Sequence, residues 1–314
     1  MIMRRFFRFA LGFAAALAVA VPASAEETGS FGFLGWARLS NNDWIGDGDD
    51  RWQSGGSSHS FMFGPEGITE APAQWGRLIE LRARIQVISP DNYTAPAAWD
   101  RRAAGVITST LNSHVEQNGF ELSAGAGLAF TGPRTGLIRF QNFIHDLTPA
   151  DDPKVPAAVE AAQIGNGIYP TLQGTAARRI RLSDHATLRP FVEGQAGVES
   201  FARVGGDLFI GPAFDGGVLL RDGTTGFNYR GLDAGARPGV SLVFGADTAR
   251  VFSSALLPAS DGYQLTPLRH RARAGVMVEG RRLSLFQGVA WLGPEFDAQP
   301  SGQVTGVFQL RLRF

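Results

Sequence analysis

The most regular pattern in the chain is an alternation of apolar and polar residues over segments of about 10–13 residues. In residues 79–87 every odd position is apolar, whereas the even positions are polar or charged: Glu80, Arg82, Arg84 and Gln86. Successive side chains of a β-strand point to opposite faces, so this strand has one apolar face and one wet face. Residues 188–199, 271–279 and 303–314 follow the same rule. The pattern predicts an all-β protein.

Two kinds of all-β protein show this alternation, the soluble sandwich and the membrane-spanning barrel. Arg and Glu recur on the polar faces of several segments, as in the hydrated lumen of a barrel. A tilted strand of about 12 residues spans the hydrocarbon core of a bilayer and is long for a soluble sheet. The last alternating segment ends on the aromatic residue Phe314, as outer-membrane barrels commonly do. We therefore predict a single-domain antiparallel transmembrane β-barrel in the bacterial outer membrane.

The alternating segments number about twelve, and an even count agrees with single-chain bacterial barrels. They lie at residues 31–43, 52–64, 77–89, 103–115, 119–131, 170–182, 187–200, 203–214, 238–253, 266–279, 282–293 and 302–314. Residues 132–168 break the alternation, and Phe140, Phe143, Ile144 and Leu147 recur there at helical spacing. We expect one or two short helices in an extracellular loop. A closed barrel leaves no strand edge that needs a partner, so we expect a monomer surrounded by outer-membrane lipids.

Composition adds the compartment and excludes several functions. A basic start and an apolar run over residues 9–21 precede Ala23-Ser24-Ala25, which matches a cleavage site. Residues 1–25 are therefore predicted to be a signal peptide, and residues 26–314 the barrel domain. The absence of cysteine excludes disulfides and thiolate metal sites. The formal net charge of zero argues against nucleic acid as a partner.

The densest group of polar residues is the segment 40–56, which is rich in Asp and Asn. These side chains offer the hard oxygen ligands that calcium prefers, although a solvated acidic turn has the same composition. The common hydrolase motifs G-x-S-x-G and H-E-x-x-H are absent from the sequence. Residue types alone therefore leave the chemistry of this loop open.

Four motifs occur in a fixed order along the chain. They are Asn42-Asp43 with Asp50-Arg51-Trp52-Gln53-Ser54-Gly55-Gly56, then Asp100-Arg101-Arg102-Ala103-Ala104-Gly105, then Gln141-Asn142-Phe143-Ile144-His145-Asp146-Leu147, and finally Trp291-Leu292-Gly293-Pro294-Glu295-Phe296 through Gln303. Together they resemble the motifs of the outer-membrane lipid A 3′-O-deacylase family, the LpxR family. The resemblance extends over nearly all of the chain after the predicted signal peptide.

The resemblance implies a twelve-stranded barrel that removes the 3′-linked acyloxyacyl group of lipid A, the lipid part of lipopolysaccharide, with the help of Ca²⁺. His145 would be the general base that deprotonates a water molecule. Asp43 would hold Ca²⁺, which polarises the ester carbonyl. Asn42 and Ser54 would complete the polar site. Asp151 stands where the family has a glutamate and would orient the imidazole or assist the metal.

The sequence also departs from the family pattern. Its only lysine, Lys154, lies away from the position of the family's active-site lysine, so Arg82, Arg84 or Arg102 would supply that charge and hold the phosphates of lipid A. Gln53 and Gly55 replace an aromatic residue and an asparagine. These changes bear on substrate specificity more than on the fold.

Alternative interpretations remain for the residues and for the function. His145 lies among apolar residues and could be a structural histidine of a helix surface, and Asp151 has Asp146 and Asp152 as neighbours of the same type. The remaining histidines, His59, His114, His185 and His270, show no recognisable partners in the sequence and are interpreted as structural. Instead of a deacylase, the chain could be a non-enzymatic barrel (a narrow pore or a structural protein) or an outer-membrane phospholipase.

Overall fold

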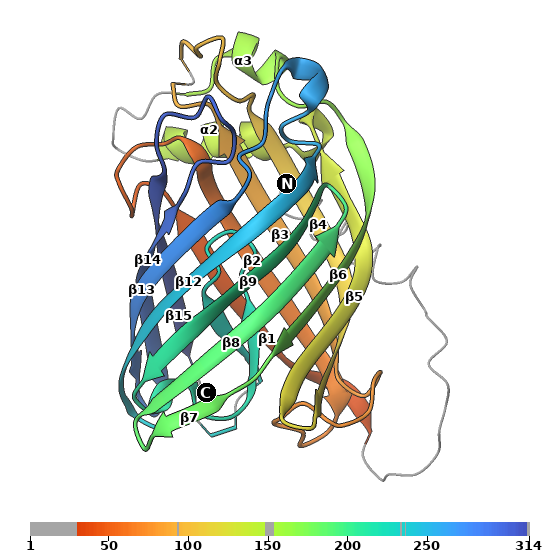
Figure 1. Ribbon diagram of the computed structural model, residues 1–314, viewed down its shortest axis with the longest axis vertical. Helices are drawn as coiled ribbons and strands as arrows, with labels where there is room; N and C mark the ends of the chain where they lie inside the picture. Colours follow the sequence, from red (N-terminus) through yellow and green to blue (C-terminus); the bar gives the residue numbers. More distant parts are fainter. Residues whose placement is uncertain (1–29, 93, 148–153, 233, 236, 313–314) are drawn as a thin grey trace. The chain divides into compact units, whose positions relative to one another are not determined.

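The computed structural model describes residues 30–92, 94–147, 154–232, 234–235 and 237–312. The described chain from Phe31 onward forms one antiparallel β-barrel (Figure 1). Its strands are β1 (Phe31–Asn42), β2 (Trp52–Pro65), β3 (Ile79–Ser89), β4 (Ala104–Gln117), β5 (Phe120–Thr131), β6 (Gly167–Ala177), β7 (Ile180–Ser183), β8 (Ala186–Ala196), β9 (Glu199–Ile210), β12 (Gly239–Ser254), β13 (Arg269–Glu279), β14 (Leu283–Leu292) and β15 (Gln303–Leu312). The predicted signal peptide lies outside the described residues.

Strands that follow one another in the chain pair with one another around the wall. β6 and β7 both pair with β8 and are two parts of one interrupted strand. Counted in this way, the wall of the described barrel has twelve strands. β1 closes the barrel against β15 through the pairs Ser40–Phe308, Asn41–Val307 and Asn42–Gly306. The predicted fold class is confirmed, and each predicted strand overlaps an observed one.

The two faces of the strands also follow the prediction. On β14 the outward residues Leu285, Val289 and Trp291 are exposed, whereas Ser284 and Phe286 are buried inside. The exposed apolar residues of the other strands continue this band around the barrel, as expected of a wall that contacts lipid. Among the described residues, no helix is long and apolar enough to cross a bilayer. The closed antiparallel wall and its apolar outer band identify the chain as an outer-membrane β-barrel.

The lumen is filled by ion pairs. Asp207 of β9 and Asp247 of β12 are both buried, and Arg273 of β13 bonds to both carboxylates. Arg271 adds a bond of 2.8 Å to Asp247, and Arg221 adds one of 2.6 Å to Asp207. Buried charges are tolerated when each carboxylate is paired and hydrogen-bonded in this way. The prediction that Arg and acidic side chains occupy the lumen is confirmed.

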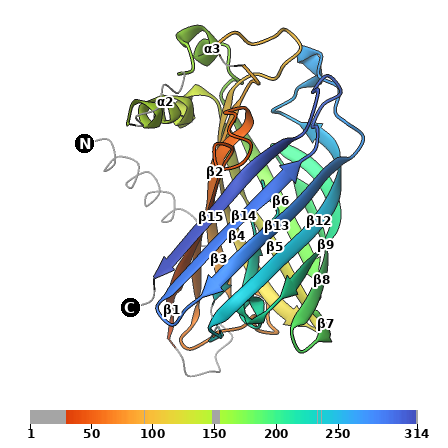
Figure 2. The same cartoon turned by 90° about the vertical axis from the view of Figure 1, so that its left-hand side faces the viewer.

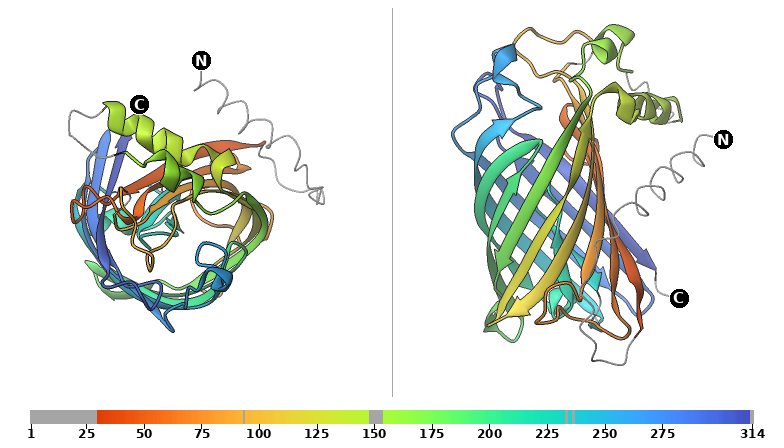
Figure 3. Two further views of the ribbon diagram at one scale, coloured as in Figure 1. Left: turned by 90° about the horizontal axis from the view of Figure 1, so that it is seen from above. Right: turned by 90° about the vertical axis from the view of Figure 1, so that its right-hand side faces the viewer.

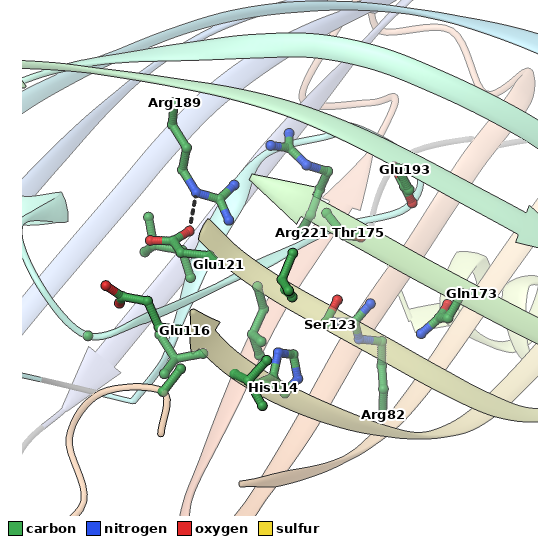
Figure 4. A pocket seen from close by; sticks show the side chains of 17 residues that line it. Arg82, His114, Glu116, Glu121, Ser123, Gln173, Thr175, Arg189, Glu193 and Arg221 are labelled. Atoms are coloured by element: carbon green, nitrogen blue, oxygen red, sulfur yellow. Dashed lines mark hydrogen bonds and ion pairs between the residues drawn. The ribbon is translucent and has the colours of Figure 1, made fainter. Parts of the chain in front are cut away.

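A two-stranded hairpin that the alternation did not predict lies inside the barrel. It consists of β10 (Val218–Arg221) and β11 (Asn228–Leu232), with Gly226 in its turn at a φ of 77°. Tyr229 of the hairpin bonds to Ser60 of β2, and Asp222 bonds to Ser58 of β2. Beside the hairpin remains a cavity of about 50 Å³, lined by Arg82, His114, Glu121, Arg189 and Arg221 among others (Figure 4). A cavity of this size holds a few water molecules.

The filled lumen leads to a prediction about ion conductance through the barrel. We expect the purified barrel to show no discrete ion-conducting openings in a planar bilayer, because the hairpin and the paired arginines fill its interior. Replacing residues 217–232 by a short Gly-Ser linker should produce such openings. Heat-modifiable migration on a gel would confirm that the variant still forms a barrel. Stable openings in the unaltered protein would support the narrow-pore alternative instead.

Two helices lie in the connection between β5 and β6, as predicted: α2 (Leu137–Leu147) and α3 (Ala157–Ala161). They are at the end of the barrel opposite the start of β1, together with the long connections β1–β2, β3–β4, β12–β13 and β14–β15 (Figure 2). We call this the loop end. Longer loops of outer-membrane barrels face outward from the cell, so the loop end belongs to the cell surface. Figure 3 shows α2 extending sideways beyond the wall beside the strands that follow β1.

Candidate active site

The carboxylate of Asp50 joins residues from two predicted motifs at the loop end. Ser54 of β2 donates its hydroxyl hydrogen to Oδ1 of Asp50 over 2.6 Å. Nε2 of His145, in the last turn of α2, lies 3.2 Å from Oδ2 of the same carboxylate. The side-chain amide of Gln141, one turn earlier on α2, also donates to it over 3.2 Å. The structure thus brings Ser54 and His145 together through Asp50, a residue that the sequence singled out only as part of a motif.

This geometry assigns different roles to Ser54 and His145. In a serine hydrolase the nucleophilic hydroxyl bonds to the histidine, and the acid lies behind the histidine. Here the acid lies between the two, and the Ser54 hydroxyl is turned to Asp50. An imidazole oriented by a carboxylate can instead deprotonate water. The arrangement fits a water-activating His–Asp pair rather than a serine nucleophile.

The helix α2 presents His145 to this site because its faces differ. Leu137, Ile138 and Gln141 are buried and fix the helix to the top of β3 and β4. The helix is tied further by Asn142, whose amide exchanges bonds of 3.0 and 2.9 Å with the backbone of Val155. Four apolar side chains of α2 stay exposed: Phe140, Phe143, Ile144 and Leu147. Their helical spacing is confirmed.

Asp43 follows β1 directly and is completely buried. Its Oδ1 accepts the backbone N–H of Trp44 over 3.0 Å, and its Oδ2 accepts that of Arg51 over 2.7 Å. Burial, and secondly the negative charge of the nearby Asp50, raise the pKa of Asp43 to about 9. Asn42 is exposed, and its Oδ1 accepts the same Trp44 N–H over 2.9 Å. Two carboxylates therefore lie near each other at the top of β1 and β2.

These residues meet part of the requirement for a calcium site. Arg51, the nearest basic side chain in the motif, pairs with Asp47, Asp49 and Asp91 and not with Asp43. Carboxylate, amide and backbone oxygens are what Ca²⁺ accepts, with water completing its shell. Among the described residues, no group of three or more His, Cys, Asp or Glu converges as a metal cage, so the donor chemistry fits but the protein supplies only part of the shell.

Behind the site, the first and last motifs of the chain bond to each other. Gln303 accepts the backbone N–H of Gln53 over 2.8 Å and donates to the carbonyl of Arg51 over 3.0 Å. Gln53 in turn donates to Glu295 over 3.1 Å, and Glu295 is ion-paired with the buried Arg101. The contacts hold the register shift between Trp52 and Gly55, which contains Ser54 and begins two residues after Asp50. Three of the four motifs therefore support one bulged strand start.

The Arg101–Glu295 pair predicts a stability effect. Replacing Glu295 by glutamine leaves the guanidinium of Arg101, whose side chain is 1% exposed, without its carboxylate. Breaking a buried ion pair from one side costs about 3–5 kcal/mol, so the free energy of unfolding in urea should fall by about 3 kcal/mol. The matched control is Glu160→Gln, because the Arg139 side chain that pairs with Glu160 is 73% exposed. The control should change stability by less than about 1 kcal/mol. Equal losses in both variants would contradict a supporting role for Glu295.

The remaining predicted site residues are placed differently. Arg82 points into the lumen and pairs with Glu80, Arg84 bonds to Thr224 of the lumenal hairpin turn, and Arg102 pairs with Asp261. None of the three bonds to the described site residues, so their assignment as the substitute for the family's lysine is not supported. Asp151 and Asp152 lie outside the described residues, and Asp146 pairs with Lys154.

Two histidines without recognisable partners in the sequence prove to have them. Nε2 of His114 lies 2.8 Å from Glu80 in the lumen, and Nε2 of His59 lies 3.0 Å from the hydroxyl of Ser57. Glu80 lies on β3, next to the strand of His114, and Ser57 lies two residues before His59 on the same strand. The alternation pattern does not reveal which side chains of one face contact each other.

Known proteins resemble this chain in structure, but the searches by sequence find no match. No family model matches the sequence, and a search of curated proteins finds no match either. Among solved structures, LpxR from Salmonella typhimurium superposes with a TM-score of 0.71 at 17% identity, covering 91% of this chain and 100% of the other. The chain has the LpxR fold. The resemblance that the sequence motifs indicate is thus confirmed at the level of the fold.

Two autotransporter barrels superpose on this chain with lower TM-scores. The β domain of BrkA from Bordetella has a TM-score of 0.42 at 12% identity, with 90% of this chain and 99% of that chain covered. The translocator domain of NalP from Neisseria meningitidis has a TM-score of 0.35 at 11% identity, with 98% and 96% covered.

Proposed function

We propose that this barrel is an outer-membrane carboxylic-ester hydrolase that removes the 3′-linked acyloxyacyl group from lipid A. The observation that carries the proposal is the pairing of His145 with Asp50 at the loop end, beside the buried Asp43. The LpxR fold and the order of the four motifs support the choice of substrate. The chain is then a diverged member of the LpxR family.

His145 acts as the general base in this reaction. Asp50 accepts a hydrogen bond from the imidazole, fixes its orientation and stabilises its positive charge after proton transfer. The imidazole takes a proton from water, and the water oxygen attacks the ester carbonyl. The bond between the carbonyl carbon and the 3′ oxygen of the sugar then breaks, and the imidazolium gives its proton to that departing oxygen. The products are a carboxylic acid and a free 3′ hydroxyl.

The neighbouring residues position these groups. Ser54 and Gln141 donate to Asp50 and hold its carboxylate toward His145. Asp43, with Asn42 and Asp50 nearby, would hold Ca²⁺. When bound, the ion supplies Lewis-acid polarisation of the ester carbonyl and offsets negative charge in the transition state. Asp151, which the family resemblance assigns to the site, keeps its proposed supporting role.

The location of the site supports a lipid substrate. The exposed apolar residues of α2 include Phe143 and Leu147, which are 54% and 66% exposed, and α2 extends beyond the wall (Figure 3). An exposed apolar surface of this kind is stable when lipid chains cover it. A substrate embedded in the outer leaflet can therefore reach His145 without leaving the membrane.

The test is to express the chain in a host that lacks this activity and to record mass spectra of its lipid A. Loss of one acyloxyacyl group from the 3′ position is the expected result. Unchanged lipid A with newly formed lysophospholipid would replace the proposal by the phospholipase alternative. Unchanged lipid A and phospholipid, with the folded barrel present in the outer membrane, would favour the non-enzymatic barrel.

A further inference from the structure

A polar cluster lies on the outer, lipid-facing side of the wall below the proposed active site. It consists of Arg38 and Ser40 on β1 and Ser57 and His59 on β2, and we call it the wall cluster. Nε of Arg38 donates to the hydroxyls of Ser40 and Ser57 over 2.9 and 3.3 Å. The two hydroxyls are 3.1 Å apart, and His59 bonds to Ser57 over 3.0 Å. The ring of His59 is stacked on Trp36, which is also exposed on this face.

Such a cluster is costly where apolar side chains normally face lipid. A charged residue on the lipid face of a barrel costs about 2–4 kcal/mol near the midplane and less toward the interface. Among the described residues, Arg38 has no carboxylate partner, and its bonds to Ser40 and Ser57 use Nε alone. Its two terminal NH₂ groups are thus the part of the guanidinium that can bind a planar pair of anionic oxygens from outside the protein.

The cluster is also directed toward the proposed active site. Ser40 is two residues above Arg38 on the same face, and Asn42 is two residues above Ser40. At about 3.4 Å per residue, the Nε–Ser40 contact lies roughly 7 Å along the strand from Asn42. Long arginine side chains carry their charge toward the membrane interface, and the bonds to Ser40 and Ser57 turn this one in that direction. A lipid held at the site would therefore place its headgroup within reach of Arg38.

We propose that Arg38, supported by Ser40 and Ser57, binds a phosphate group of the lipid substrate and so contributes to substrate selection. This inference rests on the proposed function, because it assigns the ligand as the lipid hydrolysed at His145. A guanidinium is the side chain best suited to bind a phosphate through two hydrogen bonds. The arginines that the sequence suggested for this task, Arg82, Arg84 and Arg102, are engaged inside the lumen or by Asp261.

The experiment measures binding separately from turnover. The His145→Ala protein, refolded in detergent, is titrated with bisphosphorylated lipid A and with the same lipid A after enzymatic removal of its phosphates, and bound lipid is counted by native mass spectrometry. We expect about tenfold preference for the phosphorylated lipid, the size of one charge-assisted pair. Arg38→Gln in the same background should abolish the preference, and Arg38→Lys should retain part of it because the charge remains.

Arg250→Gln is the matched control. Arg250 is an exposed arginine on the outer face of β12, four strands away from β1 around the wall, and its replacement should leave the preference at about tenfold. Heat-modifiable migration verifies that each variant is folded. The inference is overturned if Arg38→Gln keeps the preference, if Arg250→Gln loses it equally, or if phosphatidylglycerol competes as well as lipid A. If the unaltered protein hydrolyses no lipid A, the proposed function fails, while the binding ratio still decides the role of Arg38.

Discussion

Replacing His145 by alanine is expected to lower the rate of lipid A deacylation by at least about 100-fold, because a general base contributes about 10²–10⁴ to such a reaction. The structure places this imidazole 3.2 Å from the carboxylate of Asp50, which orients it. Asp50→Asn should also lower the rate, because the amide neither compensates the imidazolium charge nor fixes the same ring orientation. The measurement is the initial rate of acyl release from purified lipid A in detergent micelles, with enzyme concentration matched by folded protein.

The control for this prediction is His185→Ala. His185 is exposed in the turn between β7 and β8, at the opposite end of the barrel, so its loss should leave the rate unchanged. Ser54→Ala provides a second comparison. If Ser54 only holds Asp50, its variant retains more activity than His145→Ala, whereas a nucleophilic serine would make the two losses equal. Undiminished deacylation by the His145→Ala protein would overturn the site assignment even if the function stands.

The second large effect is expected from removal of the metal. Treatment with a calcium chelator should reduce deacylation at least about 100-fold, in line with the several kcal/mol that a Lewis-acid metal ion contributes. Added Ca²⁺ should restore the rate, and Mg²⁺ should not, because Mg²⁺ demands near-ideal octahedral geometry and gives up its water reluctantly. Asp43→Asn should produce a comparable loss that excess Ca²⁺ repairs only in part, since Asp43 is the completely buried carboxylate of the site.

Asp49→Asn is the matched control for the metal prediction. Asp49 lies in the same acidic loop, but its side chain is 65% exposed and pairs with Arg51. Its loss should change the rate less than about threefold, as expected for an exposed ion pair. Full activity in the presence of chelator would remove Ca²⁺ from the mechanism. Equal losses for Asp43→Asn and Asp49→Asn would indicate a general effect of loop charge rather than a defined ligand.

The barrel could be predicted from sequence because its pattern is local. Residues two apart in a strand lie on the same face. The alternation in residues 79–87 therefore predicted which side of β3 contacts lipid and which side faces the lumen. The same holds for α2, whose apolar residues recur at three- and four-residue spacing. The single long strand predicted at residues 170–182 is the exception, because it is interrupted between Ala177 and Ile180.

The lumenal hairpin escaped the sequence argument for a physical reason. β10 and β11 are only 4 and 5 residues long and are buried on both faces, so they show no alternation between wet and apolar sides. A signal did exist in Asp222-Gly223 and Gly226, which mark a turn. Its place inside the barrel depends on partners such as Ser58, 164 positions away from Asp222 in the chain.

The candidate site could likewise be predicted from the sequence only in part. The motifs identified His145, Asp43, Asn42 and Ser54 as polar residues of one family pattern, and the structure gathers them at the loop end. What joins His145 to Ser54 is Asp50, which bonds to Gln141 across 91 positions of sequence. The Gln303–Gln53 support likewise depends on the closure of β15 on β1, whereas the Arg38 wall cluster depends on the register in which β1 pairs with β2.

By itself, the sequence determined that this chain is a membrane barrel, where its strands run and which face of each meets lipid, because those properties follow from the spacing of neighbouring side chains. Only the tertiary structure decided which charges pair in the lumen, that a hairpin fills it, and that Asp50 connects the histidine to the acidic loop. Those contacts join residues tens to hundreds of positions apart, and closing the barrel is what brings them within bonding distance.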